Sequence, residues 1–174
     1  MKRLFFLLFL SAFIGMSCHA QIQNKIYDFV LGQTTKQEVK NYFNSKPEIE
    51  WEEDKTDESI LVEGLRFGGC YWDAVFFSFY KDVLLDVHFS AMDTEKVSKA
   101  DIKRNWEKLK QSLKKKYGSY FQEKFSTDEH LVFIDDIIML DLQIENKNGR
   151  KLLSLSYIDI KLNLAQQKGD ADEL

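Results

Sequence analysis

Strict alternation of apolar and polar residues places the tightest limit on how this chain can fold. Between residues 138 and 145 every even position is apolar, and positions 141, 143 and 145 are polar. Successive side chains of a strand point to opposite faces, so this segment predicts a strand with one buried and one solvated face. It is followed by Asn148 and Gly149, a pair that favours a tight hairpin turn. The pattern predicts an antiparallel sheet with one face against a core.

The remaining chain divides into two helices and further strands of the same kind. Thr35 and Glu38 form a capping box that opens a helix over residues 36–44, and Pro47 closes it. A second helix carries Ile102 and Trp106 at helical spacing and is expected to end at a left-handed Gly118. Strands are predicted near residues 49–51 and over residues 60–67, 72–80, 83–90, 120–125, 130–134, 137–145 and 151–164.

The order of helix and strands occurs twice, at a similar spacing in each half. Lys81 and Asp82 are predicted to join one apolar hairpin, as residues 146–149 join the other. We therefore expect an α+β fold of two tandem modules, each a helix packed on an antiparallel meander of three to four strands. The first module spans residues 21–95 and the second residues 96–165. The polar tail over residues 166–174 is expected to be disordered.

The first twenty residues have the features of a bacterial secretion signal. Lys2 and Arg3 precede an apolar run over residues 4–16, which is shorter than the roughly 20 residues of a membrane-spanning helix. Small residues at 18 and 20 predict cleavage after Ala20, which gives a secreted or periplasmic protein. The alternative is cleavage before Cys18, which would give an outer-membrane lipoprotein anchored through that sulfur.

Charge and cysteine content narrow the possible partners. Removal of residues 1–20 takes away two basic groups and changes the formal net charge from −4 to about −6. An acidic surface argues against nucleic acid or anionic lipid as a partner. After cleavage at Ala20 only Cys70 remains, so no intramolecular disulfide can form and core packing must stabilise the fold. Cys70 follows two glycines among aromatic residues and is expected to be buried.

A short motif resembles one known superfamily. Leu31, Gly32 and Thr34 lead into the capped helix through Thr35, Glu38 and Val39, and two apolar strand pairs follow over residues 72–90 and 137–158. This arrangement resembles the superfamily that includes the β-lactamase inhibitory protein and the small lipoprotein of the outer-membrane assembly machine. The chain departs from the inhibitor in lacking its disulfides. The resemblance implies an exported module whose sheet face engages another envelope or extracellular protein.

Catalytic and metal-binding residue types are sparse. The predicted mature chain has two histidines, and His88 shares the solvated face of its strand with Asp86, whereas His130 is expected in a turn. A small hydrolase that uses Asp86 and His88 is one alternative function. No third metal ligand can be placed beside them. The acidic run over residues 48–58 lacks the spacing of a calcium loop and is expected to be a solvated strand edge and loop. The sequence predicts neither a catalytic set, nor a metal site, nor a cofactor.

Aromatic residues supply the main functional hypothesis. The strand over residues 71–80 is apolar on both faces, with Trp72, Phe76 and Tyr80 on one of them, so one face needs a cover besides the helices. That cover is either the other module or a partner protein, for which Trp and Tyr are typical contact residues. We predict a non-enzymatic protein-binding module that acts through Trp51, Tyr71, Trp72, Phe76 and Tyr80. The alternatives are the lipoprotein scaffold anchored at Cys18 and the hydrolase.

Overall fold

The computed structural model describes residues 21–54, 56, 58–94 and 97–172. The predicted secretion signal and Cys18 lie outside the described residues. Three helices and nine strands follow along the described chain, with two short 3₁₀ turns between α3 and β7. In order they are β1 (Lys25–Ile26), β2 (Phe29–Val30), α2 (Lys36–Asn44), β3 (Trp51–Asp54), β4 (Ser59–Phe67), β5 (Cys70–Tyr80), β6 (Val83–Met92), α3 (Lys99–Tyr117), η1 (Gly118–Tyr120), η2 (Glu123–Phe125), β7 (His130–Ile134), β8 (Ile138–Lys147), β9 (Arg150–Asp159) and α4 (Ile160–Asp172).

Seven of the strands form one antiparallel sheet in the order β3-β4-β5-β6-β9-β8-β7. Strands β6 and β9 lie at its centre and pair over Asp86–Met92 and Leu152–Ile158, so the two halves of the chain meet there. The predicted α+β class is therefore confirmed. The halves share one sheet and one core cluster, and a division into two modules is not confirmed.

Local turn chemistry explains the two central hairpins. Lys81 and Asp82 have φ values of 49° and 66°, and Asn148 and Gly149 have values of 53° and 79°. A two-residue type I′ turn requires positive φ at both of its central residues, and its twist matches that of the paired strands. Both turns therefore join their strands as the sequence predicted, and in the first hairpin a bulge between Ser78 and Phe79 shifts the register of the pairs beyond it.

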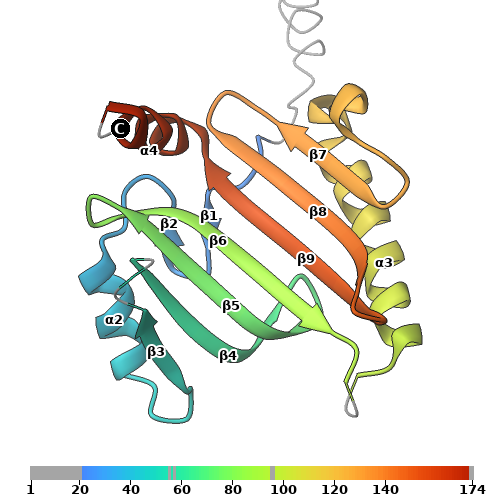
Figure 1. Ribbon diagram of the computed structural model, residues 1–174, viewed down its shortest axis with the longest axis horizontal. Coiled ribbons are helices and arrows are strands. Elements are labelled where there is room, and N and C mark those ends of the chain that lie inside the picture. The colour runs from blue at the N-terminus through green and yellow to red at the C-terminus, as the bar shows by residue number, and fades with distance from the viewer. Residues whose placement is uncertain (1–20, 55, 57, 95–96, 173–174) are drawn as a thin grey trace, which may run out of the picture.

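Helices α2 and α3 cover the same face of the sheet (Figure 1). Each begins with a capping box, at Thr35 with Glu38 and at Ser98 with Asp101. Gly118 was predicted as a left-handed cap, but its φ is −57° because the chain tightens there into the η1 turn. From α2 and α3, Phe43 and Trp106 are buried in the core beneath the strands. None of the helices in the described residues is both long and apolar enough to cross a membrane.

Two predicted strand segments have a different structure. Where a strand was predicted over residues 120–125, η1 ends at Tyr120 and η2 covers Glu123–Phe125, and between them Phe121 makes a single bridge to Phe133 along the outer side of β7. Strand β9 ends at Asp159 instead of continuing to residue 164, and α4 follows over most of the predicted disordered tail. The change occurs because Asp159 Oδ1 accepts a hydrogen bond from Leu162 N at 2.8 Å and so caps a helix.

Candidate functional site

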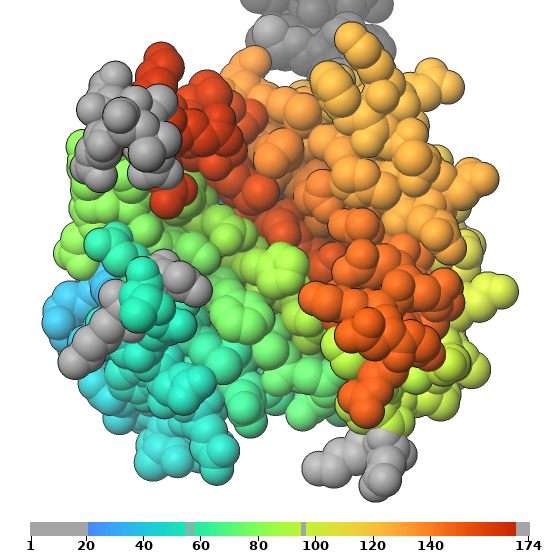
Figure 2. Space-filling view, in the orientation of Figure 1, coloured from blue at the N-terminus to red at the C-terminus, as the bar shows by residue number. Residues whose placement is uncertain are grey.

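The face of the sheet opposite α2 and α3, here called the open face, carries a mixture of polar and half-buried apolar side chains. Strands β4, β5, β6, β9 and β8 reach the molecular surface on this side (Figures 1 and 2). Across the central strands its side chains fall in register, with Phe76, His88, Ser156 and Asp141 in one row. The open face is therefore the surface on which a candidate site can be built.

The structure divides the five predicted binding aromatics between the two faces. Trp51 pairs with Val62 and packs on the core from the helix-covered face, and Trp72 is fully buried. The alternation of buried and less buried side chains along β5 breaks at Asp73 and Ala74, which are both half-buried. Trp72 is therefore buried like Val75, although the two positions are three residues apart. The predicted placement of Trp72 beside Phe76 on an open face is therefore wrong.

Tyr71, Phe76 and Tyr80 lie on the open face. Tyr71 is 43% exposed, and Phe76 is half-buried beside the ring of His88, with 6.1 Å between ring centroids. Tyr80 Oη donates a hydrogen bond to the carbonyl oxygen of Ala165 in α4 at 3.3 Å. Tyr71 is thus the most accessible of the predicted aromatics, whereas Tyr80 holds α4 against one end of the sheet.

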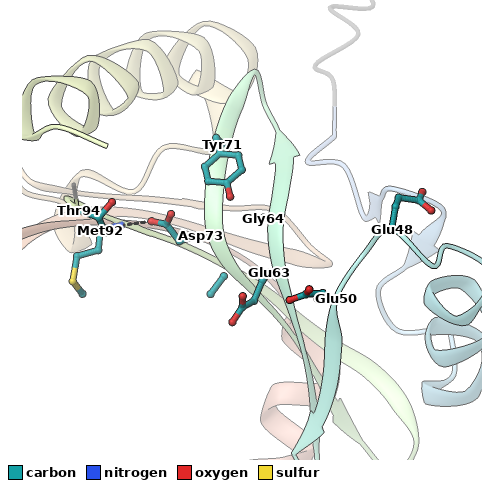
Figure 3. A pocket seen from close by; sticks show the side chains of 9 residues that line it. Glu48, Glu50, Glu63, Gly64, Tyr71, Asp73, Met92 and Thr94 are labelled. Atoms are coloured by element: carbon teal, nitrogen blue, oxygen red, sulfur yellow. Dashed lines mark hydrogen bonds between the residues drawn. The ribbon is translucent and has the colours of Figure 1, made fainter. Parts of the chain in front are cut away.

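An acidic hollow of about 860 Å³ lies beside Tyr71. Four carboxylates line it, from Glu48, Glu50, Glu63 and Asp73 (Figure 3). Asp73 Oδ2 accepts the backbone N–H of Met92 at 2.8 Å, which fixes that carboxylate at the wall. Among the described residues, the other three carboxylates make no ion pair. The acidic run therefore supplies this hollow with Glu48 and Glu50, while Glu53 of the same run is paired with Lys36 and Lys40 below the sheet.

A second, smaller hollow of about 310 Å³ lies over the centre of the sheet, here called the Asp86 hollow. Strands β5, β6 and β9 each contribute to it. The side chains around it are those of Ser59, Phe76, Ser78, Asp86, His88, Ser156 and Ile158. The structure thus brings the predicted pair Asp86 and His88 together in one hollow and adds Ser156, which the sequence did not indicate.

Burial dominates the electrostatics of the Asp86 hollow. Removal of water raises the pKa of Asp86 to about 7, and the hydrogen bond from the Ser78 hydroxyl opposes this change only in part. Burial also lowers the pKa of His88, against the opposing influence of the Asp141 carboxylate. His88 Nδ1 lies 2.8 Å from Ser156 Oγ. At neutral pH His88 is therefore uncharged, while Asp86 is divided between its protonated and ionised forms.

His130 occupies the first position of β7, where the predicted strand over residues 130–134 begins, and it does not lie within the preceding turn. Its Nε2 lies 2.6 Å from Asp141 Oδ2 on the neighbouring strand β8. This pair continues the polar row outward from His88. The alternation in β8 did place Asp141 on the solvated face, but its link to His88 depends on the pairing of β6 with β9, for which the sequence carries no local signal.

The described residues contain no group of three or more His, Cys, Asp or Glu side chains arranged to hold a metal ion. Cys70 is buried and free, and burial raises the pKa of its thiol. Its position as a small core residue agrees with the prediction. The chemistry available on the open face is therefore that of carboxylates, hydroxyls, imidazoles and aromatic rings.

The chain was compared with known protein families, with curated proteins and with solved structures, and none of them matches it.

Proposed function

We propose that this protein is an exported, non-enzymatic module that binds another protein through its open sheet face. The observation that carries the proposal is the acidic hollow beside the exposed ring of Tyr71. Aromatic residues dominate the binding energy of protein interfaces because they bury a large area with few rotatable bonds. Phe76 lies on the same face and lines the separate hollow over the centre of the sheet.

The negative charge of the acidic hollow indicates which kind of protein can bind there. The carboxylates of Glu48, Glu50 and Glu63 have no cation beside them in the described residues. A partner that presents Lys or Arg would supply the missing positive charge. Such complementarity mainly raises the association rate and is weakened by salt. The proposed partner is therefore a basic segment of an envelope or extracellular protein.

The experiment places a photo-crosslinking residue at position 71 in the full-length protein expressed in its native host. Phe125, which is 56% exposed near the opposite edge of the sheet, provides the matched control position. We expect a discrete cross-linked partner from position 71 only, and its loss when Glu50→Lys and Glu63→Lys reverse the charge of the hollow. The same products from both positions, or products unaffected by charge reversal, would contradict the proposal.

Export is supported by the composition of residues 1–20 and by the small residues before Gln21. Mass spectrometry of the purified native protein is expected to give Gln21 as the first residue. An N-terminus at Cys18 that incorporates labelled palmitate would instead establish the alternative, an envelope lipoprotein with the same binding face.

A second candidate function is a hydrolase, favoured by the contact between His88 Nδ1 and Ser156 Oγ. A neutral histidine can take the serine proton during attack on an ester carbonyl. A fluorophosphonate reagent tests this directly, because an activated serine forms a stable covalent product with it. Labelling of Ser156 that is lost in His88→Ala would support the hydrolase, and unlabelled wild-type protein would exclude this nucleophile.

We also infer that the chain contains a tandem duplication of a helix followed by an antiparallel meander. The order α2 then β3 to β6, followed by α3 then β7 to β9, supports this interpretation. The two units would then meet at β6 and β9 and share one core.

A further inference from the structure

We infer that the Asp86 hollow binds a primary ammonium group, either the side chain of a lysine or a free alkylamine. The inference goes beyond the proposed function, since it assigns a ligand to a second site on the open face. It rests on the set of side chains that four neighbouring strands, β4, β5, β6 and β9, bring together there. These supply hydrogen-bond acceptors, one carboxyl group and apolar walls, which are the features that an alkylammonium requires.

The side chains of the Asp86 hollow offer a ligand more hydrogen-bond acceptors than free hydrogen-bond donors. The hydroxyl of Ser78 is hydrogen-bonded to Asp86, and Ser156 Oγ lies against His88 Nδ1. A serine that donates its single proton keeps its oxygen lone pairs, so both hydroxyls can accept from a ligand. An ammonium group carries three donors and no acceptor, and it therefore matches Asp86, Ser78 and Ser156.

No cationic side chain of the described residues already occupies this position. The lining contains neither Lys nor Arg, and the lowered pKa of His88 leaves that ring uncharged at neutral pH. Asp86 makes no ion pair within the described residues. Even a half-buried carboxylate is partly deprived of water, and an entering cation offsets the cost of ionising it there.

Apolar side chains of the hollow can pack against the alkyl chain of the ligand. Phe76 and Ile158 line the hollow on either side of the polar group. An aromatic face attracts a nearby cation and also packs against methylene groups. These walls favour an alkylammonium over an inorganic cation, which would need several more oxygen ligands than the hollow offers.

Binding is coupled to release of a proton from Asp86. Since burial raises the pKa of this carboxyl to about 7, most of it is protonated at pH 5.5 and most is ionised at pH 8. Only the ionised form pairs with the ammonium, so the affinity at pH 5.5 is expected to be about thirty-fold lower.

Among the other titratable or charged groups, His88 shares the hollow, and Asp141 lies beyond Ser156 in the same row. Tyr80 lies on the same face of β5, and Glu58 and Lys161 lie within three residues of the lining residues Ser59 and Ile158. Further charged groups of the lining strands lie toward their other ends, at Glu63, Arg66, Asp73, Arg150 and Lys151. Protonation of His88 at low pH acts in the same direction, because it adds a like charge to that of the ligand.

The test is an NMR titration of the intact protein with 1-aminobutane and with 1-butanol as its neutral isostere. We expect saturable shifts of the His88 ring and the Ile158 methyl signals with the amine at pH 8, and much weaker shifts at pH 5.5. Asp86→Asn should abolish them, whereas Glu145→Gln, which removes a carboxylate from the same face outside the hollow, should leave them unchanged. The pH comparison uses the unaltered protein and remains informative if Asp86→Asn does not fold.

Equal shifts with 1-butanol, equal affinity at the two pH values, or undiminished binding by a folded Asp86→Asn variant would each overturn the inference. A second ligand, Nα-acetyl-lysine amide, separates the two sources of the ammonium. Tighter binding than 1-aminobutane supports a lysine within a polypeptide, and equal binding supports a free amine. If position 71 of the otherwise unaltered protein cross-links no discrete partner, the proposed function is refuted, and the result of this titration is unaffected.

Discussion

Asp86→Asn is expected to change how the stability of the protein depends on pH. In the unfolded chain this carboxyl titrates near 3.8, and in the folded protein its pKa is raised to about 7 by burial. The folded state therefore holds the proton more tightly. The resulting stabilisation is complete below pH about 4 and is lost as the pH rises through 7. Asparagine keeps a hydrogen-bonding group beside Ser78 and removes the ionisation.

The size of the effect follows from the two pKa values. At about 1.4 kcal/mol per pH unit, the full difference corresponds to about 4 kcal/mol, of which about 3 kcal/mol falls between pH 5 and pH 8. Because the side chain is only half-buried, these figures are upper limits. Urea denaturation of the wild type and of Asp86→Asn at both pH values measures the quantity. The difference between the two proteins isolates this residue, since their other titrating groups are the same.

We expect the free energy of unfolding of Asp86→Asn, relative to wild type, to increase by about 2 to 3 kcal/mol from pH 5 to pH 8. A relative stability that stays constant over this range would refute the reasoning, because it would mean that the folded carboxyl titrates at its ordinary value. A change of opposite sign would mean that an unrecognised cation stabilises the ionised form. Glu145→Gln is the matched control and should show no such trend.

Three further predictions concern the fold, each measured by urea denaturation. Trp72→Ala should lower the free energy of unfolding by about 3 to 5 kcal/mol because the ring is fully buried, whereas Tyr71→Ala should change it by less than about 0.5 kcal/mol; equal effects would contradict the assigned faces. Gly32→Ala should destabilise the protein more than Gly149→Ala, although both glycines have positive φ. The reason is that the new Cβ at position 32 would lie 2.5 Å from Asp159 Oδ2, whereas a Cβ at position 149 would meet no atom within 4 Å. The reverse order of stabilities would contradict this packing. Asp159→Ala should cost about 1 kcal/mol through loss of the α4 cap, and unchanged stability would show that this cap contributes little.

Most of the secondary structure could be predicted because its causes are local. The capping box of Thr35 and Glu38 and the two hairpin turns depend on residues a few positions apart. The helix α4 was missed because the strand was predicted to continue over residues 151–164, a range that includes the helix cap Asp159. The phase change at Asp73 and Ala74 was missed for a related reason. Gly64, on the neighbouring strand, has a φ of +70° that alternation alone does not predict.

The candidate site was predicted only in part, since its halves come from distant segments. Alternation placed Asp86 and His88 on one solvated face. It gave no information on Ser156, which is 68 residues from His88 and reaches it only through the register of β6 on β9. The acidic residues were expected to be a solvated edge, and their convergence with Glu63 and Asp73 depends on how β3 and β4 curve beside β5.

The central pairing of β6 with β9 accounts for the unusual position of Asp86. A carboxylate on a strand at the edge of the sheet would remain hydrated, as Glu52 of β3 does. Asp86 instead has β5 on one side and β9 on the other, so Ser78 and Ile158 displace water from both flanks. The same junction that joins the two halves of the chain therefore creates both the raised pKa and the hollow. A half of the chain expressed alone would lack one flank, and its Asp86 would titrate as an ordinary surface carboxyl.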